Sequence, residues 1–138
     1  MSVTTRSIEW PAQTLESVMT LHRADSRRLG FFPRGAFEDH ARVGQILLAL
    51  NDQDQVLGYL LFRVAKQRAM IVHLCTAPSS RGKGVGRQLI QHALDYFRSE
   101  GLACAVIETM EGNEAGKHLY PSCGFVEITR QIQYAMKL

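Results

Sequence analysis

The chain has 138 residues, of which 46% are hydrophobic and 21% are charged, and its formal net charge is +3 at pH 7. These values predict one folded domain over residues 1–138 with a core of its own. No apolar run is long enough to cross a bilayer, and the mildly basic charge falls short of a nucleic-acid-binding surface. We therefore expect neither a membrane nor a nucleic-acid partner, although an anionic ligand would suit the charge.

The cysteines argue against a disulfide framework and against a zinc site. Cys75, Cys104 and Cys123 are odd in number, lie far apart and form no C-x-x-C pair. The histidines show no metal-ligand spacing with cysteines or carboxylates, so we expect no bound metal. The N-terminal residues also lack the apolar segment of a signal peptide. A soluble, cytoplasmic protein is the expectation.

The N-terminal part of the chain predicts two helices. A weak helical stripe over residues 12–29 follows Pro11, and Gly30 and Pro33 interrupt it. A second, short helix is expected at about residues 36–43.

Three strands are expected next. The apolar runs at residues 45–50 and 56–65 flank five polar residues, which predicts an antiparallel hairpin. After another turn, residues 69–77 are rich in apolar and β-branched side chains. Pro78 closes this strand because proline cannot donate a hydrogen bond to a ladder.

The remaining elements alternate between helix and strand. Apolar residues recur at helical spacing from Val85, and Gly101 ends this long helix. We expect a strand at residues 102–110, a short helix entered through Asn113, and a terminal strand at residues 131–138 with alternating apolar side chains. The order of elements predicts a mixed α/β domain.

Glycines occupy alternate positions where the strand at 69–77 gives way to the long helix: Gly82, Gly84 and Gly86. The first N–H groups of a helix lack intrahelical partners, and the macrodipole adds partial positive charge there. Glycines let such N–H groups converge and leave room for a phosphate. Three cationic residues lie among them: Arg81, Lys83 and Arg87. The segment therefore predicts an anion site, with a turn that merely caps the helix as the alternative.

Two common phosphate motifs do not fit this segment. No Gly-Lys-Ser/Thr of a Walker A loop is present, and the glycines give GxGxG instead of the dinucleotide fingerprint GxGxxG. A more specific match is needed to identify the anion.

Two segments resemble the GNAT superfamily of acetyl-CoA-dependent N-acetyltransferases. "RGKGVG", residues 81–86, matches its [Q/R]-x-x-G-x-[G/A] signature. "NEAGKHLYPSCGF", residues 113–125, is similar to its N-x-x-A-x-x-x-Y-x-x-x-G-F segment, with Gly116 in place of the usual alanine. A helix and a strand separate the two matches, as the family requires, and the resemblance covers about residues 43–138.

The resemblance implies a GNAT-like fold, with a central, mostly antiparallel, splayed sheet flanked by helices. It also implies acetyl-CoA as the cosubstrate, with pantetheine and the acetyl carbonyl on the backbone of residues 74–77 and the pyrophosphate on the amides of residues 82–87. The implied donor-binding residues are Leu74, Cys75, Thr76, Arg81, Gly82, Lys83, Gly84, Val85, Gly86, Arg87 and Asn113.

Catalytic roles follow from the same resemblance. Tyr120 corresponds to the general acid of the family, and its alternative is simple packing in the core. Glu108 is spaced like the base of the ribosomal-protein alanine N-acetyltransferases. His73, in an otherwise apolar strand, is a competing base or a satisfied core histidine. Glu111 and a water molecule are further candidates.

The expected function is transfer of an acetyl group from acetyl-CoA to a primary amine of a small molecule or protein. A non-catalytic acyl-CoA-binding sensor or regulatory module is the alternative. The acceptor is left open, and we expect a monomer or a homodimer. Four arginines could recognise an acidic acceptor or form a solvated helix face: Arg23, Arg27, Arg28 and Arg34.

Overall fold

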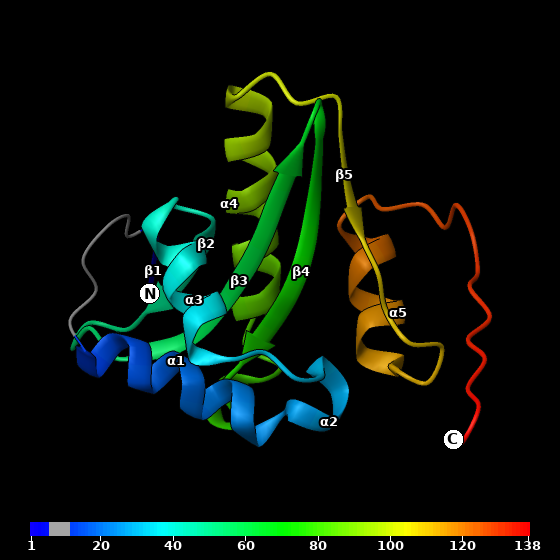
Figure 1. The fold of residues 1–138 in the computed structure, drawn as a ribbon. Helices are drawn as coiled ribbons and strands as arrows, with labels where there is room; N and C mark the ends of the chain where they lie inside the picture. Colours follow the sequence, from blue (N-terminus) through cyan, green and yellow to red (C-terminus); the bar gives the residue numbers. More distant parts are fainter. Residues whose placement is uncertain (6–11) are drawn as a thin grey trace. The chain divides into compact units, whose positions relative to one another are not determined.

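The structure is a computed structural model that describes residues 1–5 and 12–138 (Figure 1). It has two compact units, residues 1–108 and 109–138, which are described separately. The single domain expected from the sequence stays a prediction. The strands are β1 (Ser2–Thr5), β2 (Ile46–Leu50), β3 (Val56–Ala65), β4 (Arg68–Thr76) and β5 (Cys104–Ile107). The α-helices are α1 (Ala12–Ala24), α2 (Ser26–Leu29), α3 (Arg34–Arg42), α4 (Val85–Ser99) and α5 (Glu114–Ser122).

The strands of the first unit form one five-stranded sheet in the order β1-β2-β3-β4-β5. All neighbours are antiparallel except β4 and β5, which are parallel, so the expected mixed α/β fold is confirmed. The pairing of β4 with β5 runs only from Arg68 opposite Cys104 to Ile71 opposite Ile107. Beyond Ile71, the edge of β4 that faces β5 has no partner strand among the described residues. The sheet therefore opens at this point.

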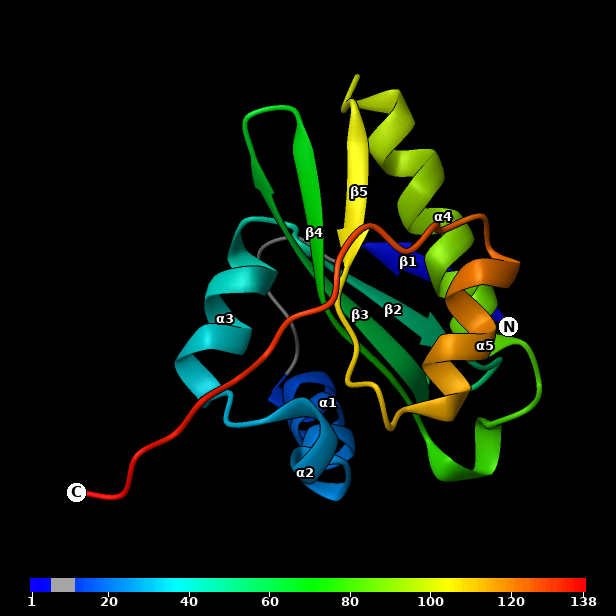
Figure 2. The same cartoon turned by 90° about the vertical axis from the view of Figure 1, so that its right-hand side faces the viewer.

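Helices cover both faces of the sheet. Helices α1 and α3 lie on one face, and α4 lies on the other (Figures 1 and 2). Because side chains alternate along a strand, successive residues of β3 serve the two layers. Tyr59 packs against Phe37 of α3 with ring centroids 5.8 Å apart, and Phe62 packs against Phe97 of α4 at 4.9 Å. The buried residues of α4, from Val85 at its start to Phe97 near its end, thus hold the helix against the sheet.

Several predicted elements are confirmed, and one strand was missed. The polar hairpin turn closes with a hydrogen bond from the Asn51 N–H to the Gln55 carbonyl at 3.0 Å. Helix α4 begins at Val85, as the apolar spacing predicts. Strand β1 was not expected, because Ser2–Thr5 is short and mostly polar. It becomes a strand by pairing with β2, where Val3 lies opposite Ala49.

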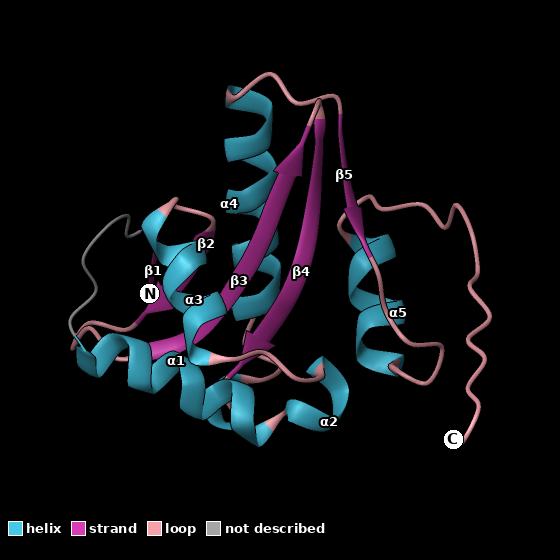
Figure 3. Cartoon of the chain, viewed as in Figure 1, coloured by secondary structure: helices cyan, strands magenta, loops and turns pink. Residues whose placement is uncertain are grey.

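The second unit contains α5 and an extended tail. The strand expected at residues 131–138 is wrong, since residues 125–138 contain neither helix nor strand (Figure 3). Their alternating apolar side chains are exposed: Val126, Ile128, Ile132, Tyr134, Met136 and Leu138. Alternation decides which face a strand would bury, but a strand also requires hydrogen-bonding partners for its backbone.

Within residues 1–5 and 12–138, no helix combines the length and apolar character needed to span a membrane.

Candidate active site

The glycine turn between β4 and α4 contains two residues with left-handed backbone conformation. Gly82 has a φ of 73° and Gly84 a φ of 82°, a region in which a Cβ atom strains the chain. No heavy atom of another described part of the chain, chain neighbours aside, lies within 4 Å of either hypothetical Cβ. Backbone geometry therefore requires glycine here, and a Cβ at either position would fill open space.

The start of α4 is positively polarised. Gly84 is the N-cap and has no side chain to cap the helix, and the Gln88 N–H donates to the Gly84 carbonyl at 3.0 Å. The N–H groups ahead of Gln88 lack intrahelical acceptors, and the macrodipole favours an anion at this end. Arg81 and Lys83 are exposed beside the turn. This arrangement suits a phosphate group.

The unpaired edge of β4 leads directly into this turn. The Leu74 carbonyl accepts a hydrogen bond from Nη2 of Arg28 at 2.9 Å, although 46 residues separate them in sequence. The Ala77 N–H donates to the Leu57 carbonyl at 2.8 Å. Two backbone groups that the sequence assigned to the donor thus have protein partners in this structure.

Asp25 contacts several of the groups around this edge, and no sequence motif indicated this role. Its Oδ2 accepts from Nε and Nη2 of Arg28 at 2.9 and 2.6 Å. The same oxygen lies 3.8 Å from Nη2 of Arg81 and 4.0 Å from Sγ of Cys75. Burial, and then the Asp25 carboxylate, raise the pKa of the Cys75 thiol to about 11, so the thiol stays protonated near neutral pH.

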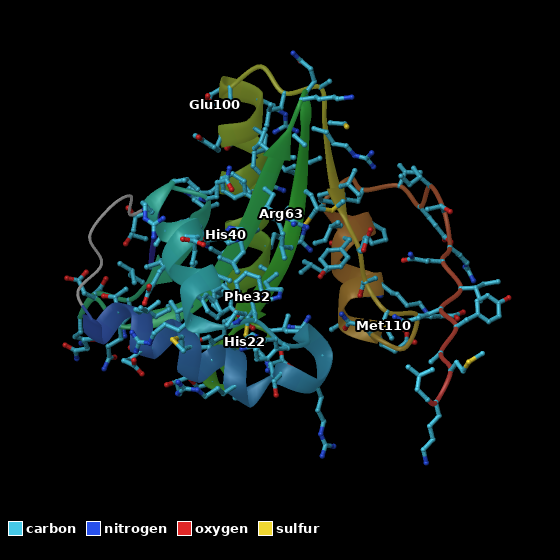
Figure 4. The ribbon with its side chains drawn as sticks, in the orientation of Figure 1. His22, Phe32, His40, Arg63, Glu100 and Met110 are labelled. Atoms are coloured by element: carbon cyan, nitrogen blue, oxygen red, sulfur yellow. The ribbon has the colours of Figure 1, made fainter. Side chains whose placement is uncertain are left out.

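The side chain of His73, on β4, lies in a buried aromatic cluster formed with residues of α1, α3 and the segment before α3. Its ring stacks on His22 with centroids 5.5 Å apart and lies 4.7 Å from Phe32; Figure 4 labels His22, Phe32 and His40 of this cluster. Among the described residues, Nδ1 of His73 has no hydrogen-bond partner. Burial, followed by the charges of His22 and His40, lowers the pKa of His73 to about 4, so the ring is neutral at pH 7.

The other base candidates are exposed. Glu108 follows β5 directly and is the last residue of the first unit. Glu111, in the second unit, forms an ion pair with Arg130 at 3.4 Å.

The second family segment forms one local structure within residues 109–138. Oδ1 of Asn113 accepts from the Gly116 N–H at 3.2 Å and caps α5, as the sequence predicted, while its Nδ2 donates to Thr109 Oγ1 at 2.9 Å. A Cβ at Gly116 would lie 2.8 Å from Asn113 Nδ2 and 2.9 Å from the Tyr120 ring. The Tyr120 ring packs edge-on against Phe125 at 6.3 Å. In this chain, a side chain at position 116 would therefore displace the Asn113 amide or the Tyr120 ring.

The predicted site residues therefore fall into two groups. Those from Leu74 to Arg87 follow one another along β4, the glycine turn and α4 in the first unit, where His73 also lies. Asn113 and Tyr120 are joined through α5 in the second unit. No group of three or more histidine, cysteine or acidic side chains in the described residues is arranged to hold a metal ion.

The sequence model of the Acetyltransferase (GNAT) family matches residues 4–125. The chain belongs to the GNAT acetyltransferase family. A GNAT relative, the ribosomal protein bS18-alanine N-acetyltransferase of Salmonella typhimurium, is 28% identical over 87 residues. That alignment covers 63% of this chain and 59% of the Salmonella protein. The streptothricin acetyltransferase of Streptomyces lavendulae is 39% identical over 59 residues, or 43% of this chain and 31% of that protein.

Solved structures show the same GNAT fold. The ribosomal-protein-S18-alanine N-acetyltransferase of Escherichia coli superposes with a TM-score of 0.74 at 21% identity, covering 93% of this chain and 79% of that one. A chain of the NatC complex bound to Gag peptide and CoA superposes with a TM-score of 0.82 at 18% identity, covering 99% and 92%. At these identities the likeness establishes the GNAT fold of this chain.

Proposed function

We propose that this chain is an acetyl-CoA-dependent N-acetyltransferase that acetylates a primary amine. Its family membership and the names of its relatives support the reaction type. The observation that carries the proposal is the glycine turn, with left-handed Gly82 and Gly84 at the start of α4, next to the open edge of β4. A turn that only caps a helix would need no opened strand beside it.

The donor fits this region through backbone groups. The amides of residues 82–87 would hold the pyrophosphate, and Arg81, Lys83 and Arg87 would add charge at exposed positions. The backbone of residues 74–76 would hold pantetheine along the strand edge. Asn113 would support the donor site indirectly, by fixing the start of α5. Both of its side-chain polar atoms form hydrogen bonds within the second unit.

The reaction needs three proton transfers, because the acceptor nitrogen loses one proton before attack and a second as the amide forms, while the departing thiolate gains one. The second nitrogen proton returns to the general acid through solvent. Acetyl-CoA supplies the acetyl group as a thioester, so the C–N bond forms as the C–S bond breaks. Only a neutral amine is nucleophilic, so a base must remove a proton from the acceptor ammonium. A strand N–H on the open edge would stabilise the negative charge on the carbonyl oxygen. Tyr120 would donate the proton that the departing thiolate takes up.

We assign the base to Glu108, with His73 as the competing assignment. Glu108 is exposed, so it can exchange protons with solvent. Burial lowers the pKa of His73 to about 4, which makes its Nδ1 a weak proton acceptor. Substitution of each residue in turn separates the two assignments.

A thiol-release screen tests the function. Purified protein would be incubated with acetyl-CoA and a panel of amino acids, peptides, polyamines and aminoglycosides, and free CoA thiol would be measured. We expect amine-dependent thiol release that falls at least tenfold in Tyr120→Phe and in Glu108→Gln, but not in His73→Gln. If Tyr120→Phe keeps full activity across the pH range, the acid assignment is wrong.

Two other outcomes would change the function itself. CoA binding without thiol release from any amine would favour the non-catalytic sensor. Thermal stabilisation by ATP equal to that by CoA would favour a general nucleotide-binding module.

A further inference from the structure

One arginine of the N-terminal helices reaches the open edge of the sheet. Arg23 and Arg27 are exposed, and Arg34 pairs with carboxylates of α1 and α3. Arg28, from the short helix α2, instead donates to the Leu74 carbonyl at 2.9 Å. Arg28 is exposed as well, and its hydrogen bond to the Leu74 carbonyl distinguishes it from Arg23 and Arg27.

Asp25 holds the Arg28 side chain in this position. Two hydrogen bonds, of 2.9 and 2.6 Å, join the guanidinium to one carboxylate oxygen. The side chain of Asp25 is only 18% exposed, whereas that of Arg28 is 33% exposed and can meet a ligand from solvent. Arg81 lies 3.8 Å from the same oxygen, so two positive charges surround one negative charge.

The position of Arg28 limits what it can do. Leu74 lies beyond Ile71, on the part of β4 that has lost its β5 partner, where the proposed function locates the thioester. A guanidinium remains charged and carries only hydrogen-bond donors, so it cannot remove a proton from the amine. Its available role is to bind an oxygen atom, as it does with the Leu74 carbonyl.

We propose that Arg28 is a specificity-determining residue that selects α-amino acceptors, in which a carbonyl or carboxylate carbon is attached to the carbon bearing the amine. This inference rests on the proposed function. The acceptor oxygen takes the hydrogen bond that Leu74 accepts in the structure, and the Leu74 carbonyl becomes available to the donor. Donor and acceptor binding are therefore coupled through one side chain.

The charge around Arg28 favours the same class of acceptor. Polyamines carry several positive charges, which Arg28 and Arg81 repel, whereas a carboxylate or carbonyl oxygen is attracted. The α-amino group of a peptide has a pKa of about 8, against about 10.4 for a lysine side chain, so a peptide N-terminus reaches the neutral, nucleophilic form more readily. Free amino acids and peptide N-termini share the oxygen-bearing carbon next to the amine.

Three acceptors in which the amine is attached to a methyl-bearing CH carbon, two with a neighbouring oxygen-bearing carbon and one without, test the proposal. Alanine, alanylglycine and isopropylamine would be compared in acetyl-CoA thiol release, using wild type, Arg28→Met and Arg28→Lys. Arg27→Met is the matched control, since Arg27 is exposed on the same helix. In Arg28→Met we expect the kcat/KM ratio of the oxygen-bearing acceptor to isopropylamine to fall about 10- to 100-fold. Arg28→Lys should keep part of the ratio, and Arg27→Met all of it.

Comparing this kcat/KM ratio between variants removes two other effects. The intrinsic reactivity of each amine is the same for every variant, and the fraction of folded protein is the same for every acceptor. The KM for acetyl-CoA should not rise in Arg28→Met, because the contact that is lost is to the acceptor and the Leu74 carbonyl is already available to the donor. A preference for alanylglycine would identify a peptide N-terminus, and a preference for alanine a free amino acid. An unchanged ratio in Arg28→Met would overturn the proposal.

A binding measurement separates this proposal from the proposed function. CoA-saturated and CoA-free wild type and Arg28→Met would be titrated with alanine and with alanylglycine. We expect CoA to tighten binding of one of them to wild type at least tenfold, and to have no such effect in Arg28→Met. Thiol release from no amine would refute the acetyltransferase function but leave this coupling measurable. Absence of coupling in wild type, or equal coupling in both proteins, would refute the role of Arg28.

Discussion

The Asp25 carboxylate lies 3.8 Å from the guanidinium of Arg81, the first residue of the glycine signature. Asp25 comes from the junction of α1 and α2, and its side chain is largely buried. A phosphate at the glycine turn would compete with Asp25 for Arg81. The structure thus couples the N-terminal helices to the proposed donor site through one ion pair.

Removing this carboxylate should strengthen CoA binding. In Asp25→Asn, Arg81 no longer has a competing anion, and we expect the Kd for CoA to fall about two- to fivefold. Pantetheine lacks the phosphates, so its affinity should not improve. Isothermal titration calorimetry with both ligands makes the comparison. Equal improvement for CoA and pantetheine would show that Asp25 acts on something other than phosphate binding.

Substitution of a left-handed glycine in the turn should lower the stability of the protein or its affinity for CoA. Gly84→Ala introduces a Cβ at a φ of 82°, which should cost about 1 kcal/mol of stability. Gly84→Asp adds a charge and should weaken CoA binding more than tenfold. Gly101→Ala is a matched control, since Gly101 has a φ of 72° and open space at its Cβ, but lies beyond the other end of α4.

These glycine variants separate folding from binding. Gly101→Ala should lose a similar unfolding free energy in urea and keep wild-type affinity for CoA. If Gly84→Asp also kept wild-type affinity, the glycine turn would not be the phosphate site.

Gly116 should be needed to position Tyr120. A Cβ there would lie 2.9 Å from the Tyr120 ring and 2.8 Å from Asn113 Nδ2, so one of these groups must move. We expect Gly116→Ala to lower kcat about 10- to 100-fold, because a small displacement of a catalytic group is costly. Gly112→Ala, where the Cβ meets open space, should leave kcat unchanged. Steady-state kinetics with the best acceptor would decide, and equal kcat values in both variants would contradict the role of Tyr120.

The buried His73 should make stability depend on pH. Burial, then His22, His40 and Arg28, hold its pKa near 4, while the Leu29 backbone opposes this shift. As the pH falls, His73 therefore becomes protonated near pH 6.5 in the unfolded chain but only near pH 4 in the folded chain. The contribution of neutral His73 to the free energy of unfolding is complete above about pH 6.5 and decreases as the pH falls toward 4.

Urea unfolding at pH 7 and pH 5 measures this effect. Wild type should lose about 1–2 kcal/mol more than His73→Leu between these pH values. His40, whose pKa burial also lowers, contributes in the same direction in both proteins and so cancels in the comparison. An equal loss in the two proteins would mean that His73 titrates normally in the folded chain.

Local sequence patterns correctly predicted the elements whose conformation is determined by interactions between nearby residues. Periodicity identified α4, the polar residues from Asn51 identified the hairpin, and alternating glycines identified the turn at Gly82 and Gly84. Each of these depends on neighbours a few positions apart.

Several features that depend on distant partners were not predicted, although the family resemblance did predict the mostly antiparallel, splayed sheet. Asp25 contacts residues 50 or more positions away, and nothing in its local sequence distinguishes it from a solvated helix residue. Strand β1 depends on pairing with β2, and the tail has strand-like alternation without a ladder. In each case the outcome depended on whether residues far apart in the sequence contact one another, which a local pattern does not contain.

Backbone amide chemical shifts on titration with CoA test the central claim most directly. The account predicts that CoA perturbs the amides of residues 74–76 and 82–87, whereas pantetheine perturbs only residues 74–76. Perturbations that avoid both segments, or that are the same for CoA and pantetheine at the glycine turn, would contradict it.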